Sequence, residues 1–355
     1  MLPELRATTS RSALLGLDLG GAHLKAALLH AGKPVAIREA ACRLWEGLDR
    51  LDAAFSEVLA GWPEPEAVAL TMTGELVDLF PDRGVGVRRL LEAVATRFPG
   101  RALRVWSFEG FLAPESAVAR PLAVASANWR ATAALLARRL PAGILVDIGS
   151  TTTDLVPFAD GSVRSCGRDD AERLTSGELV YQGVIRTPLM ALAERVPFRG
   201  RLVGVMAEYF ATTADVFRIL GRLDEEFDRH PAADNGPKTP EGSARRILRM
   251  VGTDLGAASS AEARTLAAVF AEAQLRRIAD GLALVLSRGE LPEDAPLVAA
   301  GCGSFLVTEL ARRTDRPATD LAGVLSLEGD LARWAGVAAP ALAVALLALE
   351  PEARP

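Results

Sequence analysis

The sequence contains few cysteines and no pattern that would cross-link them. Cys42, Cys166 and Cys302 are the only three in 355 residues, and no CxxC spacing occurs. An odd and scattered set is typical of reduced thiols and excludes a disulfide framework. Neither Cys166 nor Cys302 has a histidine nearby in the sequence, so packing is favoured over a nucleophilic role.

An export signal and long hydrophobic runs are missing as well. The longest apolar stretch, residues 336–349, is interrupted by Pro340 and is shorter than the roughly 20 residues that cross a bilayer. The formal net charge of −5 makes a broad nucleic-acid surface unexpected. We therefore expect a cytoplasmic protein with neither a membrane nor a nucleic acid among its partners.

Lysine is also scarce in this sequence. Only Lys25, Lys33 and Lys238 occur among 40 lysines and arginines. Because the two side chains are not interchangeable at phosphates, a retained lysine can mark a place that needs a compact ammonium. This favours Lys25, inside a Gly-rich segment, as a catalytic candidate, and it is weak for Lys33, in a Gly-Lys-Pro turn. Lys238, beside Thr239, is a candidate substrate contact that closes over a site, with a solvated loop as the alternative.

Half of the residues are hydrophobic and 24% are charged, which is a globular composition long enough for two domains. Apolar periodicity predicts strands at residues 14–19, 24–29, 35–37, 67–73, 103–106, 119–125, 143–149, 154–158, 162–166 and 297–303. It predicts helices at residues 48–59, 84–98, 128–140, 261–288, 304–313 and 334–349. We expect one lobe over residues 1–140 and a second over 141–333, with an insertion at about 169–260 and the last helix, 334–350, packing back on the first lobe.

Two segments, GLDLGGAHLKAALL and LVDIGSTTTDLVPF, form an internal repeat about 130 residues apart, each with an aspartate just before a glycine turn. Such turns present backbone N–H groups to an anion. The predicted phosphate-binding residues are Gly20, Gly21, His23, Gly149, Ser150, Thr151, Thr152 and Thr153. Asp18 and Asp147 are the predicted ligands of Mg²⁺ or a similar ion. The alternative is a pair of ordinary hairpins.

Other candidates follow buried strands. Gly301, Gly303 and Ser304 form a strand–GxG–helix turn that can hold a nucleotide or another organic group, or can be a plain turn. Asp154 or Glu75 is the candidate base, although Glu75 is equally consistent with an acid at a helix N-terminus. Thr73 and Asn128 are candidate substrate contacts, Trp129 is either a contact or core packing, and His230 is expected at the surface.

The order of these loops resembles the acetate/sugar kinase, Hsp70 and actin superfamily, and DIGSTTTD is similar to the second phosphate motif of its hydantoinase/oxoprolinase branch. Five segments resemble a family linked to tetrahydromethanopterin-dependent one-carbon transfer, which includes a methanofuran-biosynthesis enzyme. They are LTMTGELVDLFPDRGVGV (70–87), SANWRATA (126–133), SGELVYQGVIRTPL (176–189), FATTADVFRILGRL (210–223) and PKTPEGSARRILRMVGTD (237–254). The resemblance covers residues 12–350.

The resemblance implies an α/β fold of two RNase H-like (actin-like ATPase) lobes, with mixed sheets flanked by helices, a cleft between them and a mainly helical insertion. It implies a transferase that joins an aminomethylfuran diphosphate to the phenol oxygen of a tyramine- or tyrosine-type acceptor, releasing diphosphate. The partners would be these small molecules, with a homodimer possible through the apolar last helix.

Two other kinds of activity remain open. An ATP-dependent kinase or a hydantoinase/oxoprolinase-like amidohydrolase would bind ATP near residues 301–304. The chain is shorter than the hydrolases and has no Cys/His-rich stretches, which disfavours hydrolysis. A nucleotide-gated binding module, like actin or Hsp70, would need a further domain or polymer surface that the sequence does not reveal.

Overall fold

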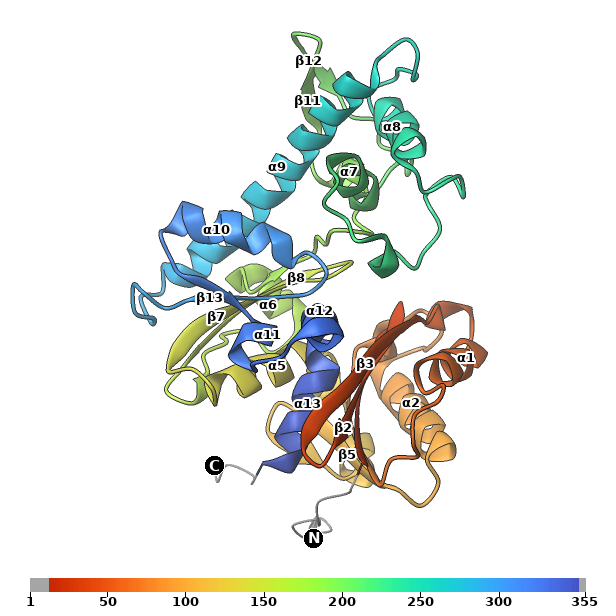
Figure 1. Cartoon of the computed structure of the whole chain (residues 1–355), viewed down its shortest axis with the longest axis vertical. Coiled ribbons are helices and arrows are strands. Elements are labelled where there is room, and N and C mark those ends of the chain that lie inside the picture. Colours follow the sequence, from red (N-terminus) through yellow and green to blue (C-terminus); the bar gives the residue numbers. More distant parts are fainter. Residues whose placement is uncertain (1–12, 351–355) are drawn as a thin grey trace. The chain divides into compact units, whose positions relative to one another are not determined.

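The computed structural model describes residues 13–350, which form two compact units (Figure 1). Of the described residues, the first unit contains 13–143, Val156–Asp169 and 321–350, and the second contains Ile144–Leu155 and Asp170–Asp320. Each holds a sheet of mixed strand direction flanked by helices, which confirms the predicted α/β fold class. The lobe boundaries at residues 140 and 333 stay predictions.

The sheet of the first unit has the order β3-β2-β1-β4-β5-β6. Its strands are β1 Ala13–Leu19, β2 His23–His30, β3 Lys33–Ala41, β4 Ala67–Met72, β5 Ala102–Ser107 and β6 Gly110–Leu112. The first three strands are antiparallel, and β4 and β5 run parallel to β1. The helices are α1 Asp49–Val58, α2 Arg83–Arg97, α3 Pro114–Ala119, α4 Pro121–Val124, α5 Asn128–Ala137, α11 Leu321–Val324, α12 Gly329–Val337 and α13 Ala339–Leu349, with 3₁₀ turns η1 Leu44–Glu46 and η2 Gly74–Leu76.

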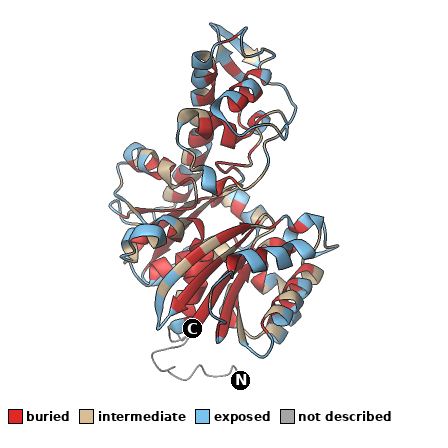
Figure 2. Cartoon of the chain, turned by 45° about the vertical axis from the view of Figure 1, so that its right-hand side comes forward, coloured by how far each residue is buried: buried red, intermediate tan, exposed pale blue. Residues whose placement is uncertain are grey.

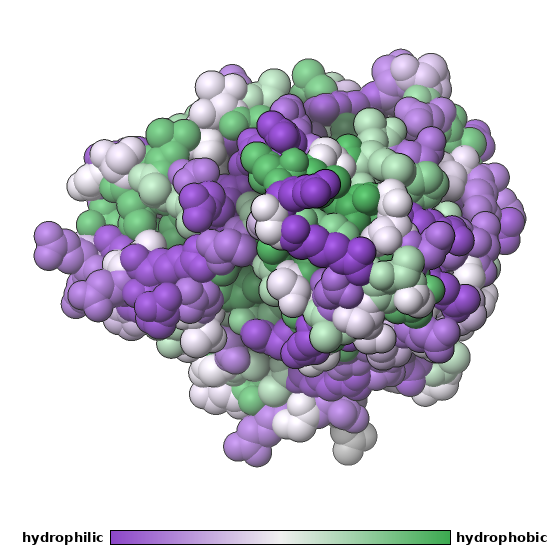
Figure 3. All heavy atoms as spheres, turned by 90° about the horizontal axis from the view of Figure 1, so that it is seen from above, coloured by the Kyte–Doolittle hydropathy of each residue, from purple (hydrophilic) through white to green (hydrophobic). Residues whose placement is uncertain are grey.

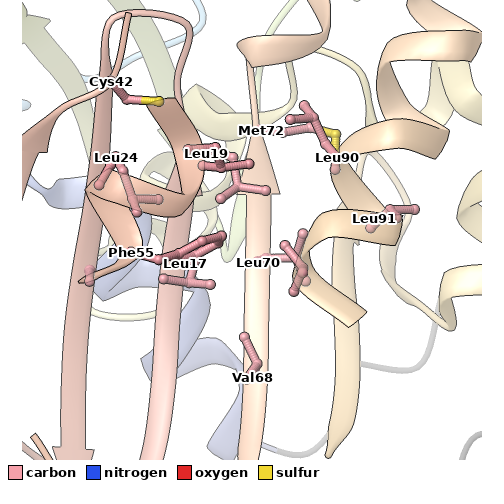
Figure 4. Packing of buried hydrophobic residues seen from close by; sticks show 14 of the residues in the cluster. Leu17, Leu19, Leu24, Cys42, Phe55, Val68, Leu70, Met72, Leu90 and Leu91 are labelled. Carbon is pink, nitrogen blue, oxygen red and sulfur yellow. The ribbon is translucent and has the colours of Figure 1, made fainter. Parts of the chain in front are cut away.

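Side chains of β1 and β4 pack on both faces of this sheet. Leu17 and Leu70 belong to one buried cluster with Phe55 of α1 and Leu90 of α2 (Figure 4). Because side chains alternate along a strand, Gly16 faces the other way, toward α13. A Cβ at Gly16 would lie 2.0 Å from the carbonyl oxygen of Ala341, so the glycine allows helix and strand backbones to approach closely.

Helix α13 is almost entirely buried and packs against β1, β4 and α5. Figure 2 shows how strongly the buried residues concentrate along the strands. The apolar composition of α13 is therefore explained by burial within its own unit, without a partner subunit.

The second sheet has the order β10-β8-β7-β13-β14, and β9 pairs with β8. It belongs mainly to the second unit, although β9, the second half of β8 and the first two residues of β7 lie in segments of the first unit. Its strands are β7 Ala142–Ile148, β8 Thr153–Ala159, β9 Ser162–Val163, β10 Leu179–Val180, β13 Leu297–Ala300 and β14 Ala318–Asp320. The helices α6 Asp170–Ser176, α9 Ser260–Leu286 and α10 Val307–Thr314 flank it, with η5 Ser304–Leu306 before α10. The long helix α9, predicted over residues 261–288, begins at a capping box between Ser259 and Glu262.

The segment between β10 and α9 contains η3 Leu189–Ala191, a hairpin of β11 Arg195–Phe198 and β12 Arg201–Gly204, α7 Thr213–Leu220, η4 Glu225–Phe227 and α8 Pro240–Arg249. Helices α7 and α8 pack on each other and on α9. A buried charge cluster joins them: the Arg246 Nε donates to Asp215 Oδ1 at 2.9 Å, Ser243 Oγ donates to the same oxygen at 2.7 Å, and Arg218 pairs with Asp215 and Asp228. Removing one partner of such a cluster costs about 3–5 kcal/mol, so it fixes this segment in one arrangement.

Three predicted elements were wrong or misplaced. Residues 119–125 are mainly helical, because Pro121 begins the helical turn α4 and cannot donate a strand hydrogen bond. Residues 334–349 are split between α12 and α13, which meet at 103° near Ala338, and Pro340 lies in the first turn of α13. The predicted strand 162–166 is reduced to β9.

Figure 3 shows hydrophilic side chains interspersed with small hydrophobic groups on the face that it presents. Within residues 13–350, no single helix has both the length and the apolar character to cross a bilayer; only the bent pair α12 and α13, taken together, passes that test.

Candidate functional site

The turn between β1 and β2, residues 20–23, is here called the first loop. Gly20 N donates to His23 O at 3.0 Å and closes the turn. The carbonyl oxygens of Gly21 and Ala22 accept hydrogen bonds from Leu44 N at 3.0 Å and Cys42 N at 2.8 Å. Among residues 13–350, the N–H groups of Gly21 and Ala22 have no acceptor.

The second loop, residues 149–152 between β7 and β8, repeats this arrangement. Gly149 N donates to Thr152 O at 2.9 Å. The Gly149 carbonyl oxygen accepts from Val184 N at 3.0 Å, and that of Ser150 accepts from Ile185 N and Arg186 N at 3.2 and 2.9 Å. The part of the chain that the structure describes offers no acceptor to the N–H groups of residues 150–152. The segment that binds these carbonyls, residues 182–187, is called the strap.

Both loops thus have carbonyl oxygens engaged on one side and consecutive N–H groups left over. Unpaired backbone N–H groups in a turn form a concavity for an anion, and leaving them unpaired without a ligand is unfavourable. An ordinary hairpin does not require this pattern twice, so the geometry fits the predicted phosphate-binding role of both loops.

The hydroxyl groups of the second loop differ in their contacts. Thr153 is fully buried, and its Oγ1 donates to the Gln182 carbonyl oxygen at 2.8 Å, so this side chain holds the strap. The Oγ atoms of Ser150 and Thr151 lie 3.4 Å apart and both residues are partly exposed. Ser150, Thr151 and Thr152 are therefore the three that can present hydroxyl groups to a ligand.

The charged residues beside the two loops differ. Asp18 of β1 lies in register with Lys25 of β2, and Asp18 Oδ2 is 3.7 Å from Lys25 Nζ. In the repeat, Asp147 stands in place of Asp18, and Asp154 stands in place of Lys25. The first loop therefore carries its own cation, whereas two carboxylates flank the second.

Carboxylate oxygens are the ligands that Mg²⁺ prefers, and Mg²⁺ usually takes one or two of them and completes its shell with water and substrate phosphates. The second loop fits such an ion better than the first. No group of three or more His, Cys, Asp or Glu side chains that could hold a metal occurs among residues 13–350. A metal at Asp147 would therefore depend on oxygens from a bound phosphate compound.

The two candidate bases have different surroundings. Asp154 Oδ1 accepts a hydrogen bond at 2.8 Å from the buried guanidinium of Arg173. Glu75 is 1% exposed in η2, and its Oε1 accepts from Ser126 N at 2.9 Å and Ser126 Oγ at 3.2 Å. Its Oε2 has no hydrogen-bond partner within residues 13–350.

Burial raises the pKa of Glu75 to about 6, against the opposing effects of its hydrogen bonds and of Arg83. A carboxylate with this pKa and an unbonded oxygen can accept a proton near neutral pH. The raised pKa favours Glu75 over the Arg173-paired Asp154, and the identity of the base stays a prediction.

The glycine turn after β13 lies against β7. Gly303 N donates to Ile148 O at 2.8 Å. A Cβ at Gly301, where φ is +79°, would lie 2.2 Å from that same oxygen and 2.6 Å from Asp147 Oδ1. The predicted residues Gly301, Gly303 and Ser304 are thus brought to the strand end that carries Asp147.

The other predicted residues lie in varied places. Thr73 N donates to Leu19 O at 3.0 Å, next to the first loop. Asn128 begins α5, two residues after Ser126, and its Oδ1 accepts from Trp129 N at 2.8 Å. Trp129 is 3% exposed and packs near the ring of Phe108.

Lys238 lies in the loop before α8. Its Nζ donates to the carbonyl oxygens of Asp228 and His230 and is 3.5 Å from Asp228 Oδ2. These contacts hold the loop together. The predicted contact of Lys238 with substrate stays a prediction.

Three residues that contact the predicted ones were not singled out by the sequence. Ser126 anchors Glu75 across 51 residues, Gly183 lies against the second loop, and Arg186 Nη1 donates to Thr151 Oγ1 at 3.2 Å. The sequence signal for Gly183 and Arg186 was the segment SGELVYQGVIRTPL, in which they stand three residues apart.

Known proteins resemble this chain over most of its length. It is 30% identical over 337 residues, 94% of this chain and 97% of the relative, to a "(4-{4-[2-(gamma-L-glutamylamino)ethyl]phenoxymethyl}furan-2-yl)methanamine synthase" of Methanocaldococcus jannaschii. A synthase of the same name from Methanococcus vannielii is 28% identical over 204 residues, 58% of this chain and 89% of that relative.

Among solved structures, nucleotide-free acetone carboxylase superposes with a TM-score of 0.53 at 12% identity, covering 83% of this chain and 66% of the other. At that identity the likeness concerns the fold, and it agrees with the predicted actin-like architecture. The family model of hydantoinase/oxoprolinase matches residues 66–326, well over half of the sequence. The chain therefore belongs to the hydantoinase/oxoprolinase family.

Proposed function

We propose that the chain is a cytoplasmic transferase that joins an aminomethylfuran diphosphate to the phenol oxygen of a tyramine- or tyrosine-type acceptor. The synthase of Methanocaldococcus jannaschii is named for a product in which a phenoxymethyl group carries the furan, and it matches 94% of this chain. The ether in that name is the bond that the proposed transfer forms.

The observation that carries the proposal is the set of unpaired N–H groups in the two loops. The transfer breaks the bond between the furfuryl carbon and a diphosphate oxygen, and the electron pair leaves with the diphosphate. Preorganised donors stabilise charge where it develops, and removing one such donor typically costs about 3–4 kcal/mol of the barrier. Each loop therefore offers donors of the kind that a diphosphate leaving group needs.

Mg²⁺ bound at Asp147 would neutralise part of the charge on the diphosphate. The turn at residues 301–303 contacts Ile148 and so fixes the strand end that carries Asp147. Lys25 is paired with Asp18 and would add positive charge at the first loop.

We assign the base to Glu75. In the proposed reaction the phenol oxygen attacks the furfuryl carbon, the new C–O bond forms, and the phenolic proton passes to the carboxylate. Glu75 is suited to this because its pKa of about 6 leaves it ionised at neutral pH while keeping it basic enough to accept a proton.

The test is incubation of the protein with aminomethylfuran diphosphate, Mg²⁺ and a series of phenolic acceptors, with diphosphate release and ether product as readouts. We expect both, and we expect Asp147→Asn and Thr152→Ala to lower the rate. Asp160→Asn, an exposed carboxylate in the turn after β8, is the matched control.

Absence of ether with every tyrosine-type acceptor would refute this function. Full rate in both loop variants would refute the assignment of the second loop. Formation of ADP from ATP would instead support a kinase or an amidohydrolase.

A further inference from the structure

Arg186 is held in place from two sides of its backbone. Its N–H donates to the Ser150 carbonyl oxygen at 2.9 Å. The carbonyl oxygens of its neighbours Ile185 and Thr187 accept from Ala214 N and Thr213 N of α7, at 3.2 and 2.9 Å. The residue is therefore fixed between the second loop and the start of a helix.

The strap that carries Arg186 is fixed as a whole. The carbonyl oxygen of Gly183 accepts hydrogen bonds from three side chains, those of Thr187 at 3.1 Å, Thr213 at 2.8 Å and Gln274 at 2.8 Å. All three donors are buried. A segment held this firmly places its side chains with little loss of entropy when a ligand binds.

The side chain of Arg186 turns toward the second loop. Its Nη1 donates to Thr151 Oγ1 at 3.2 Å, and the N–H groups of residues 150–152 are the three in this loop without an acceptor among the described residues. The positive charge also acts on Tyr209, whose phenol has a raised pKa because of burial: Arg186 opposes this rise, and the carboxylates of Asp215 and Asp228 add to it.

We propose that Arg186 is a binding residue of the second loop, where its guanidinium and the N–H groups of residues 150–152 together hold one phosphate group. A guanidinium presents a planar pair of N–H donors that matches two phosphate oxygens, which an ammonium cannot do. Each loop then has its own cation, Lys25 at the first and Arg186 at the second. That the phosphate belongs to an organic diphosphate rests on the proposed function, whereas the phosphate site itself does not.

The test is the affinity for inorganic diphosphate with Mg²⁺, measured by calorimetry at constant ionic strength on the full chain. Arg186→Gln should weaken binding by about tenfold to a hundredfold, because it removes charge-assisted hydrogen bonds. The affinity of Arg186→Lys should fall between those of the wild type and of Arg186→Gln, since lysine restores the charge without the planar pair of donors. Arg195→Gln, an exposed arginine on β11, is the matched control and should bind like the wild type.

Equal affinity of the wild type and Arg186→Gln would overturn the inference, as would a wild type that binds no diphosphate. If Arg186→Gln fails to fold, Arg186→Lys decides: weaker binding supports the inference and unchanged binding overturns it. If the wild type binds diphosphate through Arg186 but forms no ether with any acceptor, the phosphate site stands and the proposed transfer is wrong.

Discussion

The contact between the strap and the second loop can be tested by adding a single methyl group. A Cβ built on Gly183 would lie 2.4 Å from Ser150 C, 2.4 Å from Thr151 N and 2.5 Å from Gly149 O. All three are backbone atoms, so the clash cannot be relieved by the movement of a flexible side chain. Ordinary contacts begin at 3.4 Å, and Gly183→Ala must therefore separate the two backbones by about 1 Å.

A displacement of this size has two consequences. Forcing an extra methyl group into a packed site costs about 1–3 kcal/mol of stability. It also moves the N–H groups of residues 150–152 by more than the range of donor–acceptor distances over which a hydrogen bond forms. A misplacement of about 1 Å can lower an enzymatic rate about a hundredfold. Gly183→Ala should therefore lose diphosphate affinity and turnover by far more than it loses stability.

The assay compares urea unfolding, diphosphate affinity and ether formation in Gly183→Ala and Gly204→Ala. Gly204 lies at the end of β12, and a Cβ there would meet nothing within 4 Å, so it controls for the general effect of replacing glycine. A Gly183→Ala protein with the affinity and turnover of the wild type would refute the reasoning, because the loop would then not depend on the strap for its shape.

Two further predictions concern other parts of the site. Because the pKa of Glu75 is raised from 4.5 to about 6, the unfolded chain releases this proton first as pH rises, and the native state loses about 2 kcal/mol of stability between those values. Glu75→Gln should match the wild type in urea unfolding below pH 4.5, exceed it above pH 6, and form little ether; unchanged turnover would contradict the base assignment. Gly301→Ala should destabilise the protein more than Gly329→Ala does, since both have positive φ but only a Cβ at Gly301 meets another atom, Ile148 O at 2.2 Å; equal losses in thermal unfolding would contradict this.

The elements that the sequence predicted well are those whose signal is local. The strand–turn–strand repeats and the capped helix α9 each depend on residues that are neighbours along the chain. Residues 119–125 were misassigned because a short apolar run is compatible with either a strand or a helix, and the proline that decides it can begin a helical turn. The break near Ala338 had its signal in Pro340, which was used to exclude a membrane span but not to divide the helix.

By itself, the sequence determined the two strand–glycine turn–strand elements with their adjacent aspartates, because hairpin geometry follows from the few residues of the turn, and it predicted that these turns bind an anion. Only the tertiary structure decided which N–H groups remain unpaired, since the strap that engages the second loop is more than 30 residues away in the sequence. It also decided that Glu75 has a raised pKa while Asp154 is paired with Arg173. The burial of a side chain and the charges around it depend on residues that are distant in the sequence, so a local sequence pattern does not predict them.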